Sequence, residues 1–105
     1  MNTVKKGSRN EKKCADIFRG KGWAVWKTFR SKFMNLDMFG LFDVVCLHPG
    51  GHKMLFIQVK SNRCDKKTKN NIRALKMPPH CEKWVWIWHD RKGWTMEELN
   101  ERSKT

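Results

Sequence analysis

Long apolar runs are missing from this sequence of 105 residues. No stretch approaches the roughly 20 apolar residues that a membrane-spanning helix needs. The first residues, MNTVKKGSRNEKK, also lack the apolar segment of a secretion signal. We therefore expect an intracellular, cytoplasmic protein without a membrane span, and a phage or a virus is one source that we consider.

Acidic residues are scarce, and C-x-x-C cysteine pairs are absent. The 10 Asp and Glu residues stand against 23 Lys and Arg, which gives a net charge of +13. This excess favours a polyanionic partner, with nucleic acid first and an acidic membrane surface second, while an inert basic surface is the plain alternative. The four cysteines, without a secretion signal, are expected to be reduced thiols.

Hydrophobic periodicity and turn signals predict a single domain over residues 1–105, with residues 1–7 disordered. The S-x-x-E pattern of Ser8 and Glu11 is typical of a helix N-cap, and apolar residues at helical spacing follow it. A first helix is therefore expected from Ser8 to about Gly20 or Gly22. We predict strands over 23–29, 41–47, 54–60 and 83–89, a basic helix over 65–76, and a last short helix capped by Thr95. This order indicates an α/β fold with a mixed β-sheet flanked by helices.

Residues 41–60, LFDVVCLHPGGHKMLFIQVK, place polar residues inside two apolar runs that flank a Pro-Gly-Gly turn. A turn centred on residues 50 and 51 pairs positions whose numbers sum to 101, so Asp43 should lie opposite Gln58. Alternation along the strands puts Lys60 on the face of Gln58, and Phe42 with Val44 on an opposite face that is wholly apolar. Opposed Cβ atoms lie about 5 Å apart, so Asp43, Gln58 and Lys60 should cluster.

The expected cluster suits a hard divalent cation. The Asp43 carboxylate, the Gln58 amide oxygen and the Val59 backbone carbonyl are oxygen ligands of the kind that Mg²⁺ and Mn²⁺ prefer. Glu11 joins them if the first helix packs on the sheet, whereas a capping box with Ser8 would explain it without any such role. Lys60 would act on the attacking water and on the phosphorane. A cross-strand salt bridge between Asp43 and Lys60 is the plain alternative.

These residues resemble the signature of the PD-(D/E)XK nuclease superfamily. The signature combines an acid in the first helix, an Asp that opens the second strand, and (E/Q)-x-K on the third, matched here by Glu11, by Asp43 in FDVV and by QVK at 58–60. The spacing, and the stretch GSRNEKKCADIFRGKGWAV, are similar to archaeal Holliday junction resolvases and related phage nucleases. Phe42 replaces the proline, and Gln58 replaces the usual acid and removes a charge. Asp37 is a nearby carboxylate that would compensate, unless it is a solvated loop residue.

The resemblance implies a restriction-endonuclease-like fold and a Mg²⁺- or Mn²⁺-dependent endonuclease. It would be a homodimeric hydrolase acting on Holliday junctions or other branched DNA in recombination. The catalytic residues would be Glu11, Asp43, Gln58 and Lys60, and the metal ligands Asp43, Gln58, Val59 and Glu11. The DNA-binding residues would be Arg9, Arg30, Ser31, Lys32, Arg63, Lys66, Lys67 and Lys69.

Two other functions stay open, as does one stripe of aromatic residues. One alternative is a catalytically silent nucleic-acid-binding domain on the same fold, and the other is a sequence-specific endonuclease of restriction or homing type. Trp84, Trp86 and Trp88 alternate along the expected strand over 83–89. We expect them to be core residues rather than base-stacking residues or a dimer contact.

Overall fold

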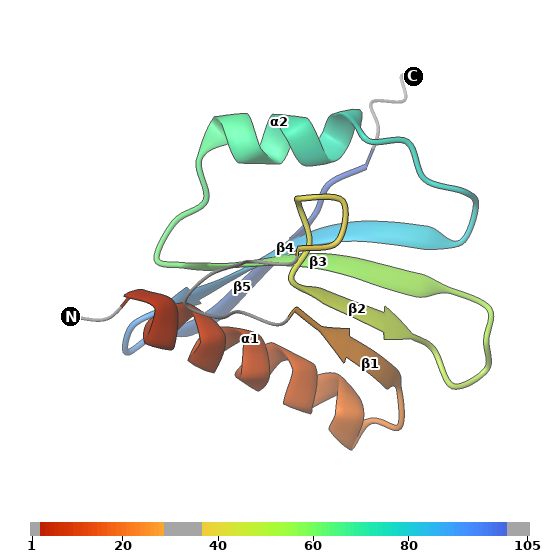
Figure 1. The fold of residues 1–105 in the computed structure, drawn as a ribbon, viewed down its shortest axis with the longest axis horizontal. Coiled ribbons are helices and arrows are strands. Elements are labelled where there is room, and N and C mark those ends of the chain that lie inside the picture. The colour runs from red at the N-terminus through yellow and green to blue at the C-terminus, as the bar shows by residue number, and fades with distance from the viewer. Residues whose placement is uncertain (1–2, 29–36, 101–105) are drawn as a thin grey trace.

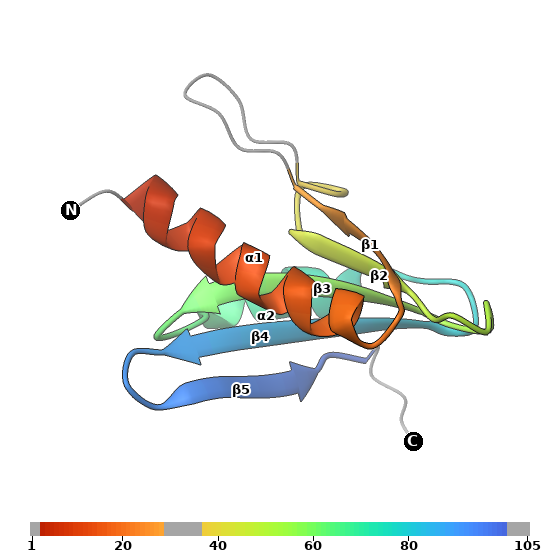
Figure 2. The same cartoon turned by 90° about the horizontal axis from the view of Figure 1, so that it is seen from below.

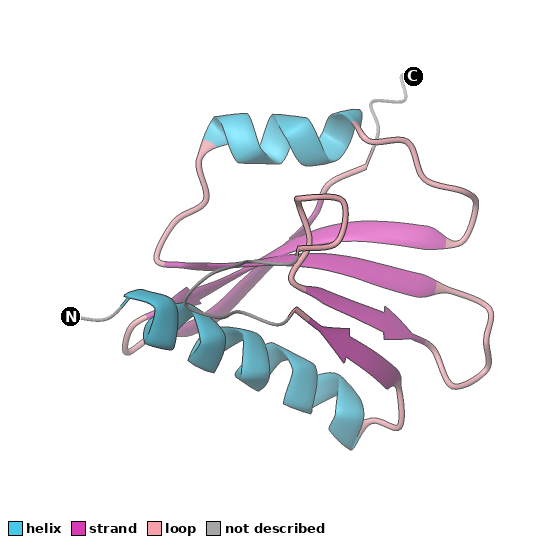
Figure 3. Cartoon of the chain, in the orientation of Figure 1, coloured by secondary structure: helices cyan, strands magenta, loops and turns pink. Residues whose placement is uncertain are grey.

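The computed structural model describes residues 3–28 and 37–100. Two helices and five strands follow one another as α1 (Thr3–Gly20), β1 (Ala24–Lys27), β2 (Val44–Leu47), β3 (Met54–Ser61), α2 (Lys66–Ala74), β4 (Cys81–His89) and β5 (Gly93–Glu98). The strands form one sheet in the order β1-β2-β3-β4-β5, in which only β3 and β4 run parallel. The helices lie on opposite faces of this sheet (Figures 1 and 3). The predicted mixed sheet flanked by helices is therefore confirmed.

Helix α1 covers one face of the sheet and begins earlier than its sequence suggests. It starts at Thr3, so Ser8 lies inside the helix, and the prediction of an N-cap at Ser8 is wrong. Lysine-rich sequence is compatible with helix, and S-x-x-E also occurs in helix interiors. The predicted apolar stripe is confirmed. Its buried members Cys14, Ala15 and Phe18 pack on Val44, Cys46, Leu55, Ile57, Val59 and Trp86.

Helix α2 covers the other face, and both of its ends are held by side chains. Asp65 is the N-cap and accepts a hydrogen bond of 2.8 Å from the Thr68 amide. Near the other end, the buried Lys83 ammonium of β4 donates to the carbonyls of Ile72 (2.7 Å), Arg73 (3.0 Å) and Leu75. Last-turn carbonyls have no partner within a helix and carry the negative end of its dipole. Lys83 therefore fixes α2 to the sheet.

The last predicted helix is wrong, because the segment after Thr95 forms strand β5 beside β4. Pairing with a neighbouring strand overrides the local capping signal. The indole of Trp94 packs against those of Trp86 and Trp88, with ring centroids 5.3 Å apart in both pairs. Trp86 is buried in the core under α1 and Trp84 packs against it, as predicted, whereas Trp88 is half-buried between Trp94 and the Lys13 ammonium of α1. On the opposite face of β4, Val85 is fully buried in the cluster beneath α2.

The four cysteines, Cys14, Cys46, Cys64 and Cys81, are free thiols. Neither of the helices within residues 3–28 and 37–100 combines the length and the apolar character needed to cross a bilayer.

Candidate active site

The β2–β3 hairpin has the predicted register along its regular part. Val44 pairs with Ile57 and Leu47 with Met54, so the paired numbers sum to 101. The turn is closed by a hydrogen bond from the Gly51 amide to the His48 carbonyl, 2.8 Å long. Gly51 has a φ of +75°, a backbone conformation that residues other than glycine rarely adopt. Turn chemistry therefore sets the pairing that leads toward Asp43.

The strand becomes irregular at Asp43. Phe42 is buried in the cluster beneath α2, whereas Val44 is buried beneath α1. Residues two apart share a face in a regular strand, so the prediction that Phe42 and Val44 share an apolar face is wrong. The chain bends at Asp43, the regular pairing stops at Val44, and the Asp43 amide donates to the Ile57 carbonyl at 2.9 Å.

Where the regular pairing stops, the Asp43 carboxylate accepts a hydrogen bond that a strand backbone would otherwise accept. It is fully buried, and its Oδ2 accepts hydrogen bonds from the Val59 amide (2.9 Å) and from Gln58 Nε2 (2.8 Å). The N–H and C=O groups of one strand residue point to the same side, so the Val59 carbonyl also faces this end of β2. Gln58 Nε2 lies 3.4 Å from that carbonyl oxygen. Asp43 and Gln58 are therefore in contact, as the register predicts, and the Val59 carbonyl lies beside them.

Glu11 reaches the same region from α1. Its side chain is 2% exposed, and Cys14 lies one helical turn further along. The pKa of the Cys14 thiol is raised, chiefly by burial and then by the neighbouring Cys46, Asp43 and Glu11. Both carboxylates thus act on one thiol from two different elements. Since Ser8 is not a cap, packing of α1 on the sheet is what places Glu11.

A partly buried hydrogen bond next to Glu11 joins α1 to β3. Asn10 is 3% exposed, and its Nδ2 donates to Ser61 Oγ at 2.7 Å. Ser61 directly follows Lys60 in the sequence. This one contact therefore links the neighbours of two predicted catalytic residues. Our sequence-based reasoning missed it, because a polar residue beside an apolar stripe resembles an ordinary exposed position.

Strand β1 contributes residues that the sequence analysis also missed. Lys27 Nζ lies 3.9 Å from Glu11 Oε1, and the Lys27 side chain is 21% exposed. The buried Thr28 donates its amide to the Asp43 carbonyl (2.7 Å) and its hydroxyl to Asp37 Oδ1 (3.3 Å). Asp37 is half-buried in its loop, and Thr28 bonds both its side chain and the backbone carbonyl of Asp43. A basic residue near the end of a short edge strand was the only signal available.

Lys60 is half-buried and lies two residues beyond Gln58 on the same face of β3. The pKa of the Asp65 carboxyl is lowered, first by its hydrogen bonds from Thr68 and then by the charges of Lys60 and Arg63. Lys60 thus lies at the open end of β3, within electrostatic reach of the first turn of α2.

The oxygen groups around Asp43 can be compared with the ligands that a divalent cation needs. Within residues 3–28 and 37–100, no three His, Cys, Asp or Glu side chains gather closely enough to hold a metal. Mg²⁺ usually binds one or two carboxylates and keeps several waters. The Asp43 carboxylate, the Glu11 carboxylate and the Val59 carbonyl are oxygen groups of the kind that such an ion takes. Gln58 fits once its amide turns over, because its nitrogen rather than its oxygen now faces Asp43.

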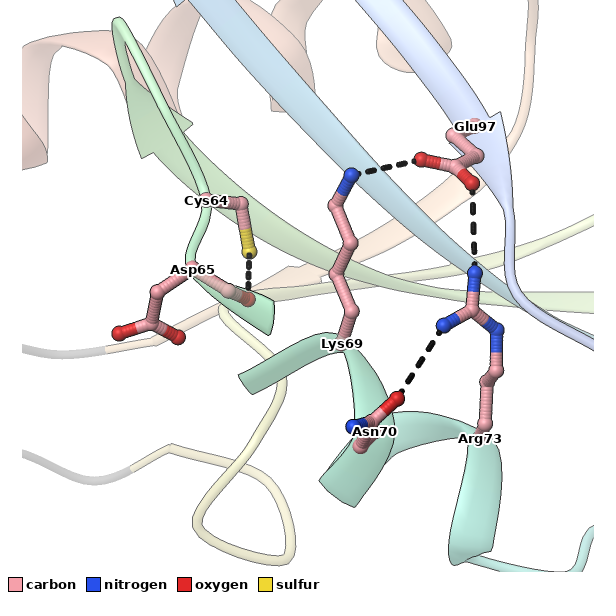
Figure 4. A network of polar contacts seen from close by, with 6 residues as sticks. All are labelled: Cys64, Asp65, Lys69, Asn70, Arg73 and Glu97. Atoms are coloured by element: carbon pink, nitrogen blue, oxygen red, sulfur yellow. Dashed lines mark hydrogen bonds and ion pairs between the residues drawn. The ribbon is translucent and has the colours of Figure 1, made fainter. Parts of the chain in front are cut away.

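The predicted DNA-binding residues divide into three groups. Arg9, Arg63, Lys66 and Lys67 are exposed. Lys69 instead pairs with Glu97 of β5 at 2.9 Å, and Arg73 approaches the same carboxylate at 3.4 Å, as Figure 4 shows. These pairs link α2 to β5. Arg30, Ser31 and Lys32 lie outside the described residues.

The fold is similar to that of a solved nuclease, Hjc from Archaeoglobus fulgidus, a Holliday junction resolvase from an archaeal hyperthermophile. The TM-score is 0.65, and the match covers 95% of this chain and 80% of that chain at 19% sequence identity. At this identity the likeness shows the fold, and it confirms the restriction-endonuclease-like architecture that the sequence predicts. No protein-family model matches the chain, and no curated protein sequence matches it.

Proposed function

We propose that this chain is a divalent-metal-dependent endodeoxyribonuclease that hydrolyses phosphodiester bonds in branched DNA, Holliday junctions included. The observation that carries this proposal is the fully buried Asp43 carboxylate, held by the Val59 amide and by Gln58 where the β2–β3 pairing stops. Burying a carboxylate is costly unless it is well bonded. Its occurrence at the signature position, on a fold shared with a Holliday junction resolvase, favours a catalytic role.

Each proposed residue has a distinct task. Asp43, Glu11, the Val59 carbonyl and the Gln58 amide oxygen would hold Mg²⁺ or Mn²⁺. When bound, the ion would lower the pKa of a coordinated water and offset charge on the phosphate. The Lys60 ammonium would orient that water and stabilise the negative charge that develops on the phosphate oxygens. Lys27 would limit the repulsion between Glu11 and other negative groups.

The DNA would be held by the exposed basic side chains of α1, of α2 and of the segment before α2. Arg9, Arg63, Lys66 and Lys67 are available for this, whereas Lys69 would first have to leave Glu97. Affinity should fall steeply with salt, because cation release dominates such binding. A homodimer would supply two sites for two cuts. Its interface cannot use Val85, which is buried in the chain's own core.

A catalytically silent DNA-binding domain is the second candidate. Gln58 favours it, because a neutral amide stands beside Asp43 where a second carboxylate would bring a negative charge to the site. Cleavage assays separate the two functions. A labelled four-way junction, a linear duplex and a single strand are incubated with Mg²⁺, with Mn²⁺ and with a chelator.

The wild type should cleave the junction faster than the duplex with either metal, and cleave nothing with the chelator. Lys60→Ala should lose cleavage but keep DNA binding, because one side chain is a small part of a surface of net charge +13. The matched control is Lys76→Ala, an exposed lysine beyond the end of α2, which should keep both. Tight binding without cleavage of any substrate would establish the silent domain instead.

A further inference from the structure

An exposed apolar hollow lies on the sheet outside the candidate active site. Its volume is about 260 Å³, and it is lined by Ala24, Val25, Trp26, Val45, Leu47 and Met54. Trp26 and Leu47 are each 39% exposed, which is unusual for large apolar side chains that adjoin one another. We call it the Trp26 hollow. Every lining side chain is apolar, so the hollow offers contact area rather than hydrogen-bonding groups.

The strand register places this hollow on the same face as part of the candidate active site. Trp26 pairs with Val45, and Val45 pairs with Phe56. Directly paired residues share a face, and Gln58 lies two residues beyond Phe56 on that face. Trp26 and Gln58 are two strand spacings apart across the sheet and two residues apart along β3. Their backbones are therefore about 12 Å apart. That is roughly three or four base steps at 3.4 Å each.

The two helices leave this part of the sheet open. Helix α1 packs against β1, β2 and β3 from the opposite face, and α2 packs on β4. Figure 1 shows α2 set back from β1, and Figure 2 shows β1 at one margin of the sheet. A second hollow of about 360 Å³ shares Leu47 and Met54 with the first and adds His52, Lys53 and His80. The second hollow lies at the turn end of the hairpin, on the side of the Trp26 hollow away from Asp43.

We propose that the Trp26 hollow binds an unpaired nucleobase of the DNA substrate, stacked on the Trp26 indole. The proposal rests on the nucleic-acid-binding part of the proposed function. A chain of net charge +13 attracts a polyanion, and exposed indoles stack on bases of any sequence. The volume lies below the roughly 300–1,000 Å³ of drug-sized pockets and suits a single ring system. Branched DNA presents unpaired bases where pairs open at its branch point, and intact duplex DNA does not.

Equilibrium binding in the presence of a chelator tests this without any cleavage. The probes are a fluorescent duplex and the same duplex with a few unpaired thymines in one strand. Trp26→Ala should weaken binding of the second probe by about 5- to 150-fold, and Trp26→Phe should weaken it less. Binding of the intact duplex, and the salt dependence of both, should not change, because no cation is removed. Met96→Ala is the matched control, since Met96 is 49% exposed on the other edge strand, β5.

Photocrosslinking of the wild type tests the contact directly, whether or not the variants fold. A 5-iodouracil at the unpaired position should crosslink to the peptide that contains Trp26. Crosslinks confined to other peptides, or an equal loss of affinity for both probes in Trp26→Ala, would overturn the proposal. So would sedimentation showing that Trp26→Ala dissociates a wild-type dimer, because a second copy would then occupy the hollow. None of these outcomes depends on nuclease activity.

Discussion

The two ends of the β2–β3 hairpin follow different structural rules. At the turn end, backbone pairs from Val44–Ile57 to Leu47–Met54 are regular. At the other end the chain bends at Asp43. There the Asp43 carboxylate, rather than the backbone of a neighbouring strand, accepts the hydrogen bond from the Val59 amide. The contrast shows that the cluster of Asp43, Gln58 and Val59 exists because the regular β2–β3 pairing stops there. The backbone groups left over at the end of a sheet become available to a carboxylate, and in our proposal to a cation.

The strongest way to break this comparison is to remove the Asp43 carboxylate. Asp43→Ala should lower cleavage by about 10²–10³-fold or more, and should destabilise the fold by about 1–3 kcal/mol because the Val59 amide loses its acceptor. Asp43→Asn keeps an acceptor oxygen, so it should lose activity but little stability. Single-turnover cleavage and urea denaturation measure the two effects.

The control for this pair lies at the turn. His52→Ala, at an exposed position, should change stability by less than about 0.5 kcal/mol. Equal destabilisation by Asp43→Asn and Asp43→Ala would mean that hydrogen bonding to Val59 is not what Asp43 provides to the fold.

A change at Gln58 tests the role of charge at the Asp43 end of the hairpin. Gln58→Glu replaces a donor to Asp43 with a second carboxylate, so repulsion should destabilise the metal-free protein by about 1 kcal/mol. The same change should tighten Mg²⁺ binding by about tenfold, because a second anionic ligand joins the site. Thermal unfolding with and without Mg²⁺ measures both, since a ligand of the folded state raises the melting temperature. A melting temperature unaffected by Mg²⁺ in both proteins would count against a metal site.

The turn end of the hairpin, where Cys46 lies, can be tested by measuring stability at different pH values. Burial raises the pKa of the Cys46 thiol to about 12 from 9.0. Above pH 9 the unfolded chain ionises this thiol while the folded chain does not, so stability should fall as pH rises from 9 toward 12. At pH 10 the loss should be on the order of 1 kcal/mol. Cys46→Ala removes the thiol and should lower the pH dependence of denaturation by that amount; an unchanged dependence would show that Cys46 can ionise in place.

The smallest expected effect comes from the link between α1 and β3. Asn10→Ala and Ser61→Ala each remove one partner of the 2.7 Å hydrogen bond. A double-mutant cycle on unfolding free energy should give a coupling of about 1 kcal/mol. Both variants should slow cleavage by displacing Glu11 and Lys60, while Asp16→Ala on the exposed face of α1 should not. Additive effects of the two changes would indicate that the bond does not position α1.

Periodicity and turn chemistry predict much of this fold, because they report local preference and burial. The hairpin register follows from the residues around Gly50 and Gly51, and the α1 stripe follows from its helical spacing. The strand β5 was missed because the segment after Thr95 also matches a helix start, although it forms a hairpin with β4 across a short turn. The start of α1 was misplaced since a capping pattern does not identify which residue begins a helix.

The candidate site could be predicted only in part. Asp43, Gln58 and Val59 come from one hairpin, so register alone brings them together. The bend at Asp43, which moves Phe42 to the α2 face, has no sequence signal in the hairpin pattern. Contacts between elements, such as Lys27 with Glu11, depend on how α1 lies over the sheet. Spacing along the chain does not encode that placement.

A crystal structure with Mn²⁺ tests the metal site most directly. We predict an anomalous peak within coordination distance of the Asp43 carboxylate, the Val59 carbonyl oxygen and a Gln58 side chain that has turned its amide oxygen inward, away from its present orientation. Asp43→Asn crystals grown under the same conditions should lack that peak. A wild-type structure without Mn²⁺ at Asp43, in which Gln58 Nε2 still donates to the carboxylate, would contradict the account.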